Sequence, residues 1–184
     1  MQMEERILAE KCRMGDNTAR KELYDCYAAR LLAVCMRYTG DRSEAEDVMH
    51  DAFLKIFGAF DRFSYRGAGS LRAWLERIAV NTALEWLRGR NRLRKLPLDE
   101  GRALPDVAGP DASKVAEVPR EVLMRFVGEL PDGYRTVFNL YCIDEYSHRE
   151  IAEMLGINEK SSSSQLFRAR ALLARRIRKY LDEH

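Results

Sequence analysis

Apolar residues recur every three or four positions through most of this chain, which is the period of helices that bury one face. The pattern predicts helices that begin near Glu4, Asp16, Ser43, Ser70, Pro119, Pro131, Ser147 and Asn158. Two of these starts, Ser43 with Glu46 and Ser147 with Glu150, match the capping box, in which both side chains satisfy free amides. Gly15, Gly40 and Gly156 mark helix ends. We therefore predict an all-α fold.

The stretch from Ser70 to Lys95 is expected to be an amphipathic helix with a strongly basic end. Its apolar face carries Leu71, Trp74, Leu75, Ile78, Thr82 and Trp86. The other face carries Arg72, Arg77, Asn81 and Arg88, and the cations continue at Arg90, Arg92, Arg94 and Lys95. Because a helix end needs far less positive charge than this for its dipole, we expect the basic end to meet an anion.

An aromatic and basic segment, FDRFSYRGAGS, precedes this helix. Phe60, Phe63 and Tyr65 alternate in it with Arg62 and Arg66, ahead of glycines that favour a loop. Aromatic rings among cations suit unstacked bases together with a phosphate backbone. The alternative is an ordinary core helix followed by a solvated tail.

The helix that begins near Ser43 has two distinct faces. Ala45, Val48, Ala52 and Ile56 form the face expected in the core, whereas Glu44, Asp47, Asp51 and Leu54 form a second face that is acidic and partly apolar. A solvated face would account for the carboxylates. It accounts less well for Leu54 and Phe53, so a partner helix that carries arginines is an alternative.

Residues 96–119 contain four of the five prolines and little that could be buried. The segment carries the acids Asp99, Glu100, Asp106, Asp111 and Glu117. We predict a flexible acidic linker between two small helical domains. Its acidity could serve solubility, or it could occupy a basic channel in the manner of nucleic acid.

The segment from Ser147 to Leu181 has the pattern of a helix-turn-helix, in which Gly156 allows the sharp turn and Asn158 caps the last helix. Ser162, Leu166, Ala169 and Leu173 are its expected buried positions. Lys160, Ser163, Ser164 and Phe167 then point outward, where a recognition helix meets base edges, and Arg149, Arg168 and Arg170 flank them near the phosphates. A generic helical hairpin is the alternative.

Composition limits the possible chemistry. The chain has 184 residues, is 46% hydrophobic and has a formal net charge of +2, so the distribution of charge matters more than its sum. Cys12, Cys26, Cys35 and Cys142 are scattered and are expected to be buried reduced thiols. No phosphate-binding glycine loop, catalytic histidine arrangement, signal segment or membrane-spanning run occurs in the sequence. We therefore expect a cytoplasmic protein that is no enzyme, with no catalytic residue, metal, cofactor or membrane insertion.

Three blocks, in order, resemble bacterial sigma factors of the extracytoplasmic-function (ECF) type in the sigma-70 family. They are LYDCYAARLLAVCMRYTGDRSEAEDVMHDAFLKIF, RGAGSLRAWLERIAVNTALEWLR and LPDGYRTVFNLYCIDEYSHREIAEMLGINEKSSSSQLFRARALL. The resemblance implies an N-terminal helical bundle over 1–95 (region 2), which docks on RNA polymerase and recognises and melts the minus-ten element. It also implies a linker over 96–118 and a helix-turn-helix domain over 119–184 (region 4) for the minus-thirty-five element. The implied partners are core RNA polymerase, promoter DNA and an anti-sigma factor.

The resemblance also assigns residues, within the faces described above. The minus-ten strand would contact Phe63, Tyr65, Arg66, Trp74, Arg77, Asn81 and Arg88. The minus-thirty-five element would contact Arg149, Lys160, Ser163, Ser164, Phe167, Arg168 and Arg170. The polymerase clamp helices would contact Asp47, His50, Asp51, Phe53 and Leu54.

Two positions depart from the family's pattern, since His50 stands where Gln is common and Ser163 where Lys or Arg is frequent. Two other functions are alternatives: a helix-turn-helix regulator with an N-terminal sensory or dimerisation domain, and a helical adaptor that binds only proteins. The regulator leaves the aromatic, basic segment and the acidic face without a task.

Overall fold

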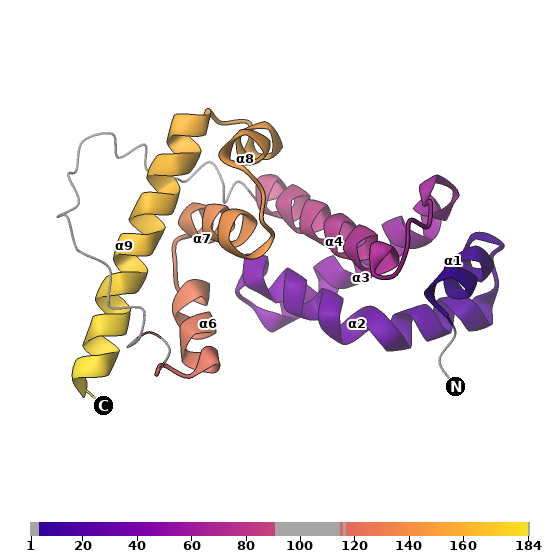
Figure 1. The fold of residues 1–184 in the computed structure, drawn as a ribbon, viewed down its shortest axis with the longest axis horizontal. Coiled ribbons are helices and arrows are strands. Elements are labelled where there is room, and N and C mark those ends of the chain that lie inside the picture. Colours follow the sequence, from indigo (N-terminus) through magenta and orange to yellow (C-terminus); the bar gives the residue numbers. More distant parts are fainter. Residues whose placement is uncertain (1–3, 91–114, 116, 184) are drawn as a thin grey trace. The chain divides into compact units, whose positions relative to one another are not determined.

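The computed structural model describes residues 4–90, 115 and 117–183, and every regular element in this part of the chain is helical. The chain divides into two compact units, Met1–Gly89 and Arg90–His184 (Figure 1). This confirms the predicted all-α fold with two helical domains. The predicted cations Arg92, Arg94 and Lys95, and most of the predicted acidic linker, lie outside the described residues.

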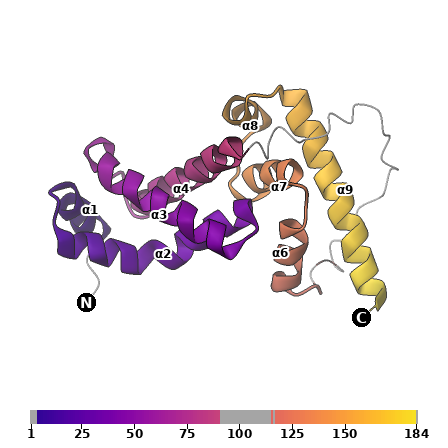
Figure 2. The same cartoon turned by 180° about the vertical axis from the view of Figure 1, so that it is seen from behind.

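The first unit contains α1 (Glu5–Arg13), α2 (Asn17–Thr39), α3 (Arg42–Ala59), the 3-10 helix η1 (Phe60–Arg62) and α4 (Ser70–Gly89). Helices α2, α3 and α4 pack on one another, and α1 packs on α2, η1 and α4, as both views of the ribbon show (Figure 2). The largest fully buried side chains of this unit are Tyr38, Leu23, Leu31, Ile56, Leu71, Leu75, Leu84, Leu87 and Val48. A three-helix core therefore supports the faces that the sequence analysis singled out on α3 and α4.

The start of α3 differs from the prediction. The helix begins at Arg42, and its N-cap is Asp41, whose carboxylate accepts the Glu44 N–H at 2.9 Å. Ser43 therefore lies inside the first turn and makes no capping box with Glu46, which pairs instead with Arg42 at 2.9 Å. The reason is local, because Asp41, two residues before Ser43, caps the Glu44 amide and so starts the helix two residues earlier. The predicted boundaries of the preceding helix α2, at Asp16 and Gly40, are confirmed.

The second unit contains α6 (Arg120–Gly128), α7 (Asp132–Phe138), the π-helical segment η2 (Asn139–Ile143), α8 (His148–Leu155) and α9 (Glu159–Glu183). One cluster of its buried residues joins α6 to α9 and consists of Val118, Phe126, Val127, Leu130, Ala169, Leu173 and Ile177. The buried guanidinium of Arg135 donates to the carbonyl oxygens of Gly128 at 2.7 Å and Leu130 at 3.3 Å. This charged group thereby fastens α7 to the end of α6.

The helix-turn-helix prediction is confirmed at each of its local signals. Ser147 and Glu150 form the predicted capping box, in which Glu150 accepts the Ser147 N–H at 2.8 Å. Gly156 ends α8 with a φ of 67°, a left-handed conformation that favours glycine. Asn158 accepts the Ser161 N–H at 2.7 Å. All four predicted inward positions of α9 are buried: Ser162, Leu166, Ala169 and Leu173.

Candidate nucleic-acid and polymerase interfaces

The polar face predicted for α4 is exposed. Arg72, Arg77, Asn81 and Arg88 are all exposed, but only Arg77, Asn81 and Arg88 share one side of the helix. Arg72 is nine residues before Asn81 and therefore points to the opposite side. The buried side packs on α2 and α3; it is centred on Ala79 and Ala83, with Leu75 and Leu87 beside them. Trp74, Ile78 and Trp86, predicted on the apolar face, are consequently only half-buried. Arg77, Asn81 and Arg88 thus give the second half of α4 an exposed side that carries cationic and amide groups.

The aromatic segment before α4 turns two of its three rings inward. Phe60 and Phe63 form a cluster with Trp74, in which the ring centres of Phe63 and Trp74 are 4.9 Å apart. Phe63 is only 9% exposed, so the prediction that its ring meets bases directly is wrong for this structure. Phe63 is buried because the rings of Phe60 and Trp74 pack against it and exclude water. Tyr65, at 37% exposed, is the ring that this segment presents to solvent.

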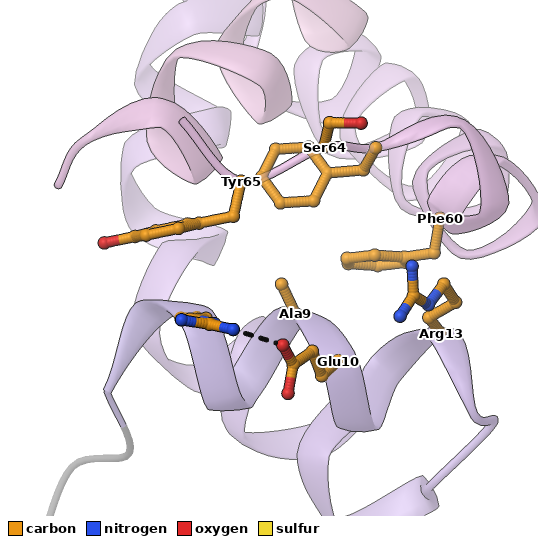
Figure 3. A pocket seen from close by; sticks show the side chains of 8 residues that line it. Ala9, Glu10, Arg13, Phe60, Ser64 and Tyr65 are labelled. Carbon is orange, nitrogen blue, oxygen red and sulfur yellow. Dashed lines mark hydrogen bonds and ion pairs between the residues drawn. The ribbon is translucent and has the colours of Figure 1, made fainter. Parts of the chain in front are cut away.

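A cavity of about 230 Å³ lies between α1 and this aromatic segment (Figure 3). From α1 it is lined by Arg6, Ala9, Glu10 and Arg13, and from the other side by Phe60, Phe63, Ser64 and Tyr65. The side chains of α1 face the ring of Tyr65 across the cavity. Arg6 pairs with Glu10 at 3.2 Å. The arrangement places cationic groups of α1 beside an aromatic surface, which is suited to a nucleotide chain.

Sequence reasoning missed the part that α1 takes in this site. Arg6 and Arg13 are seven residues apart, two helical turns, and therefore lie on one face of α1. That spacing was readable in the sequence. What the sequence could not show is that the segment from Phe60 to Tyr65 packs opposite this face.

The acidic face predicted for α3 is exposed except at Glu44, which is half-buried, and the neighbouring Phe53 is buried. Asp47, His50, Asp51 and Leu54 follow one side of the helix, and Leu54 is 71% exposed. Phe53 is only 3% exposed and packs against the ring of Tyr24, with ring centres 4.8 Å apart. Phe53 therefore belongs to the core, and the prediction that it contacts a partner directly is wrong for this structure. It supports α3 from beneath.

The outward face of α9 is the one that the sequence predicts. Lys160, Ser163, Ser164 and Phe167 are exposed, Phe167 by 55%. Among the flanking cations, Arg149 and Arg170 are exposed and Arg168 is half-buried. Ser163 and Ser164 give this face short hydroxyl groups in place of long side chains, whereas Ser162 is buried.

Contacts around η2 fix the position of α9 against α8. His148 Nδ1 lies 2.9 Å from Ser162 Oγ, and the His148 ring stacks on Tyr141 with ring centres 4.5 Å apart. The guanidinium of Arg170 lies over the same tyrosine ring, 5.7 Å from its centre. The turn between the two helices is therefore braced by side chains from three elements.

The cysteines differ from the prediction at one position. Cys12 and Cys35 are buried, and burial raises the pKa of the Cys12 thiol to about 11 and that of Cys35 to about 12, so both stay protonated at neutral pH. Cys26 is half-buried, whereas Cys142 is exposed because it lies on the outer side of η2. Within the described ranges no helix has the length and apolar character needed to cross a membrane.

Comparisons with known proteins match both units. The model of the family described as Sigma-70 region 2 matches residues 23–93, and the model described as Sigma-70, region 4 matches residues 120–173. The ECF RNA polymerase sigma-E factor of Escherichia coli (strain K12) is 28% identical over 96% of this chain and 95% of its own length. The RNA polymerase sigma-H factor of Pseudomonas aeruginosa is 28% identical over 99% of this chain and 98% of its own.

This chain belongs to the sigma-70 family, as a sigma factor of the ECF type. A solved structure of CnrH in complex with the cytosolic domain of CnrY is also similar, with 25% identity and a TM-score of 0.50 over 95% of this chain and 97% of that one. In this sigma factor, the region 2 match contains the acidic face of α3 and the basic face of α4, and the region 4 match contains the helix-turn-helix. Helix α1, which lines the cavity, lies outside both matches.

Proposed function

We propose that this sigma factor binds core RNA polymerase, directs it to particular promoters and opens the DNA strands at their start sites. The observation that carries the proposal is that one compact unit exposes an acidic, partly apolar face on α3 and a basic, amide-bearing face on α4. The two faces suit two different partners, one a basic protein surface and the other a nucleic acid. The helix-turn-helix unit supplies a third contact.

The α3 face is proposed as the polymerase-docking surface. Asp47 and Asp51 would oppose cationic side chains on the clamp helices, while the exposed Leu54 would supply apolar contact at the centre. His50 stands between the two aspartates, where Gln is common in the family. Phe53 takes part only by holding α3 against α2.

The α4 face and the segment before it are proposed as the site for the separated non-template strand. Arg66, Arg77 and Arg88 would contact phosphates, Asn81 would hydrogen-bond a base, and Tyr65 would stack on one. Removing a base from the duplex stack costs a few kcal/mol, and stacking on an aromatic ring returns about 1–3 kcal/mol. Because these terms nearly cancel, strand opening needs the further binding energy that polymerase supplies.

The outward face of α9 is proposed to lie in the major groove at the minus-thirty-five element. Hydroxyl groups donate and accept without preference, whereas bidentate pairs give about 1–3 kcal/mol of discrimination between bases. With Ser163 and Ser164 at the centre, recognition would depend mainly on Lys160, on phosphate contacts by Arg149, Arg168 and Arg170, and on DNA shape. Neither unit alone is expected to bind promoters tightly, so joining them in one chain raises the effective concentration of the second.

A regulatory partner and a place of action follow from the same proposal. The complex of CnrH with the cytosolic domain of CnrY supports a protein partner of the anti-sigma class for this chain. Because core polymerase and promoter DNA are its partners, the chain would act in the cytoplasm. It would contribute binding energy and no reacting group, so we expect no catalytic residue, metal ion or cofactor.

Association with core polymerase, followed by transcription, tests the proposal. The purified chain should co-elute with core polymerase in size-exclusion chromatography, and the complex should start transcription at defined sites that core polymerase alone does not use. A helix-turn-helix regulator would bind DNA without core polymerase, and a protein-binding adaptor would bind no DNA. If the complex formed but started transcription no more specifically than core polymerase, the proposal would be wrong.

A further inference from the structure

The start of α4 is held by a side chain that lies far earlier in the chain. The Glu5 carboxylate of α1 accepts the Gly69 N–H at 2.8 Å through one oxygen and the Arg72 N–H at 3.3 Å through the other. The first N–H groups of a helix have no partner within the helix itself. Helix α4 therefore receives part of its N-terminal cap from α1, where a negative charge also complements the helix dipole.

The turn before α4 is also fastened from within. Ser70 Oγ accepts the Arg66 N–H at 3.1 Å and donates to the Gly67 carbonyl oxygen at 2.7 Å. Gly67 and Gly69 have φ angles of 115° and 84°, a region that favours glycine and leaves the backbone few barriers to other conformations. Two sets of hydrogen bonds therefore hold the turn that joins Tyr65 and Arg66 to α4. Ser70 makes one set within the turn, and Glu5 makes the other from α1.

Glu5 is itself held in place. The Tyr27 side chain of α2 hydrogen-bonds the Glu5 carboxylate; burial, then the charge of Glu5 and this bond, raise the pKa of Tyr27, so its hydroxyl stays protonated and donates. Leu8, Ala9 and Cys12, on the same side of α1 as Glu5, are buried and anchor the helix in the core. The position of the Glu5 carboxylate is therefore fixed relative to α2 independently of its hydrogen bonds to the turn.

The same helix forms one wall of the cavity that faces Tyr65 (Figure 3). Any shift of the turn relative to α1 would alter the distance between the Tyr65 ring and the cationic side chains Arg6 and Arg13. The contact between Glu5 and the Gly69 amide is one of the ties that sets this distance. This contact lies where the segment from Phe60 to Ser70 joins α4.

We infer that Glu5 is a positioning residue for promoter opening: by capping α4 from α1, it holds Tyr65 and Arg66 in the conformation that receives the separated strand. The inference rests on the proposed function of the α4 face. It concerns a helix to which neither the family matches nor the sequence analysis assigned a part.

Two substitutions at Glu5 should give a graded result. Glu5→Ala removes both acceptor oxygens, whereas Glu5→Gln keeps one acceptor oxygen and loses the charge. The neighbouring Glu4→Gln is the matched control, because it removes the same charge from an exposed side chain that makes no cap hydrogen bond. Loss of an N-cap corresponds to about a fivefold change in equilibrium, so Gly69 and Arg72 amides should exchange about fivefold faster in Glu5→Ala.

The functional measurement uses the complex of the full chain with core polymerase. Promoter opening, followed by permanganate reactivity of unpaired thymines, should slow in the order wild type, Glu5→Gln, Glu5→Ala, while Glu4→Gln matches wild type. Affinity for core polymerase should stay within about twofold in all variants, because the α3 face is untouched. A role in general stability alone would lower opening and core association together.

Three outcomes would overturn the inference. Unchanged exchange at Gly69 and Arg72 in both Glu5 variants would show that the cap does not form in solution. Faster exchange with normal opening would show that the cap does not position the strand site. If the wild-type complex itself failed to open promoters, the proposed function would fail first, and the exchange data would still decide whether the cap exists. Glu5→Gln keeps the test valid if Glu5→Ala does not fold.

Discussion

The two surfaces that we propose meet DNA are built in different ways. The surface on the first unit joins α1 to the segment from Phe60 to Ser70 and to α4; these last two adjoin each other, whereas α1 is far from both in sequence and is brought to them by packing. The surface on the second unit comes from the consecutive helices α8 and α9, and local caps set both ends of α8 and the start of α9. A substitution in the first surface should therefore act through neighbours, whereas one in the second should act at its own position.

The largest effect should come from reversing charge on the α3 face. Asp47→Arg plus Asp51→Arg should weaken association with core polymerase by about 100-fold or more, because like charges across an interface cost several kcal/mol. Both side chains are exposed, so the circular dichroism spectrum should not change. Competition binding to core polymerase measures the loss, and it tests whether the first unit's docking face is separate from its strand site.

A matched control shows whether position or net charge is responsible. Asp25→Arg plus Asp182→Arg makes the same change in charge at two other exposed helical positions. This variant should bind core polymerase as well as wild type does. Equal weakening by both double variants would mean that the α3 face has no special part.

Phe63 and Tyr65 give the sharpest test of how the first surface is built. Phe63→Ala should lower the free energy of unfolding by about 3 kcal/mol, because it removes a buried ring from the cluster with Phe60 and Trp74. Tyr65→Ala should change that free energy by less than about 1 kcal/mol yet slow promoter opening about tenfold, through lost base stacking. Urea unfolding and permanganate footprinting measure the two effects. Tyr65→Phe keeps the ring and should open promoters normally; a loss there would contradict the stacking role.

Asn81 should affect opening without affecting docking. Asn81→Ala should slow promoter opening about 2- to 10-fold, the range expected for one lost hydrogen bond, while affinity for core polymerase changes little. The side chain is exposed on α4, so no loss of stability is expected. Parallel measurement of opening and of core binding separates the two, and an equal loss in both would argue against a role in strand capture.

Smaller effects are expected at the second surface. Ser163→Ala plus Ser164→Ala should change the preference between promoter and random duplex DNA by less than about 1 kcal/mol, since hydroxyl groups discriminate weakly. Arg149→Ala should weaken binding to all sequences alike and reduce the slope of log affinity against log salt by about 1. Fluorescence anisotropy at several salt concentrations would show both. A large loss of sequence preference in the serine variant would show that these two hydroxyl groups read the bases directly, contrary to the prediction.

The smallest signal is the order of thiol reaction. Cys142 should be alkylated first at pH 8, because it is exposed, whereas Cys12 and Cys35 should stay unmodified. Burial raises their pKa to about 11 and about 12, so thiolate is scarce below those values, and its share rises only as pH approaches them. Mass spectrometry after maleimide treatment gives the order, and denaturant should make all four react. Early labelling of Cys12 would show that α1 opens readily.

The sequence by itself determined the helices, their caps and the whole helix-turn-helix, because capping, the left-handed glycine turn and the inward positions of α9 are interactions between residues close in the chain. It also determined that Asp47 and Asp51 of α3 and Arg77, Asn81 and Arg88 of α4 are exposed. The error at the start of α3 arose because Asp41 and Ser43 can each serve as an N-cap, and spacing alone does not rank them.

Tertiary structure alone decided which aromatic rings reach solvent and what part α1 plays. Phe53, Phe63 and Tyr65 look alike in sequence, but contact with Tyr24 and Trp74 buries the first two and leaves the third exposed. The Glu5 carboxylate meets the Gly69 amide across 64 positions, a pairing that no periodic pattern encodes. Burial is a property of all the neighbours that surround a side chain, and those neighbours come from helices whose packing the local sequence does not specify.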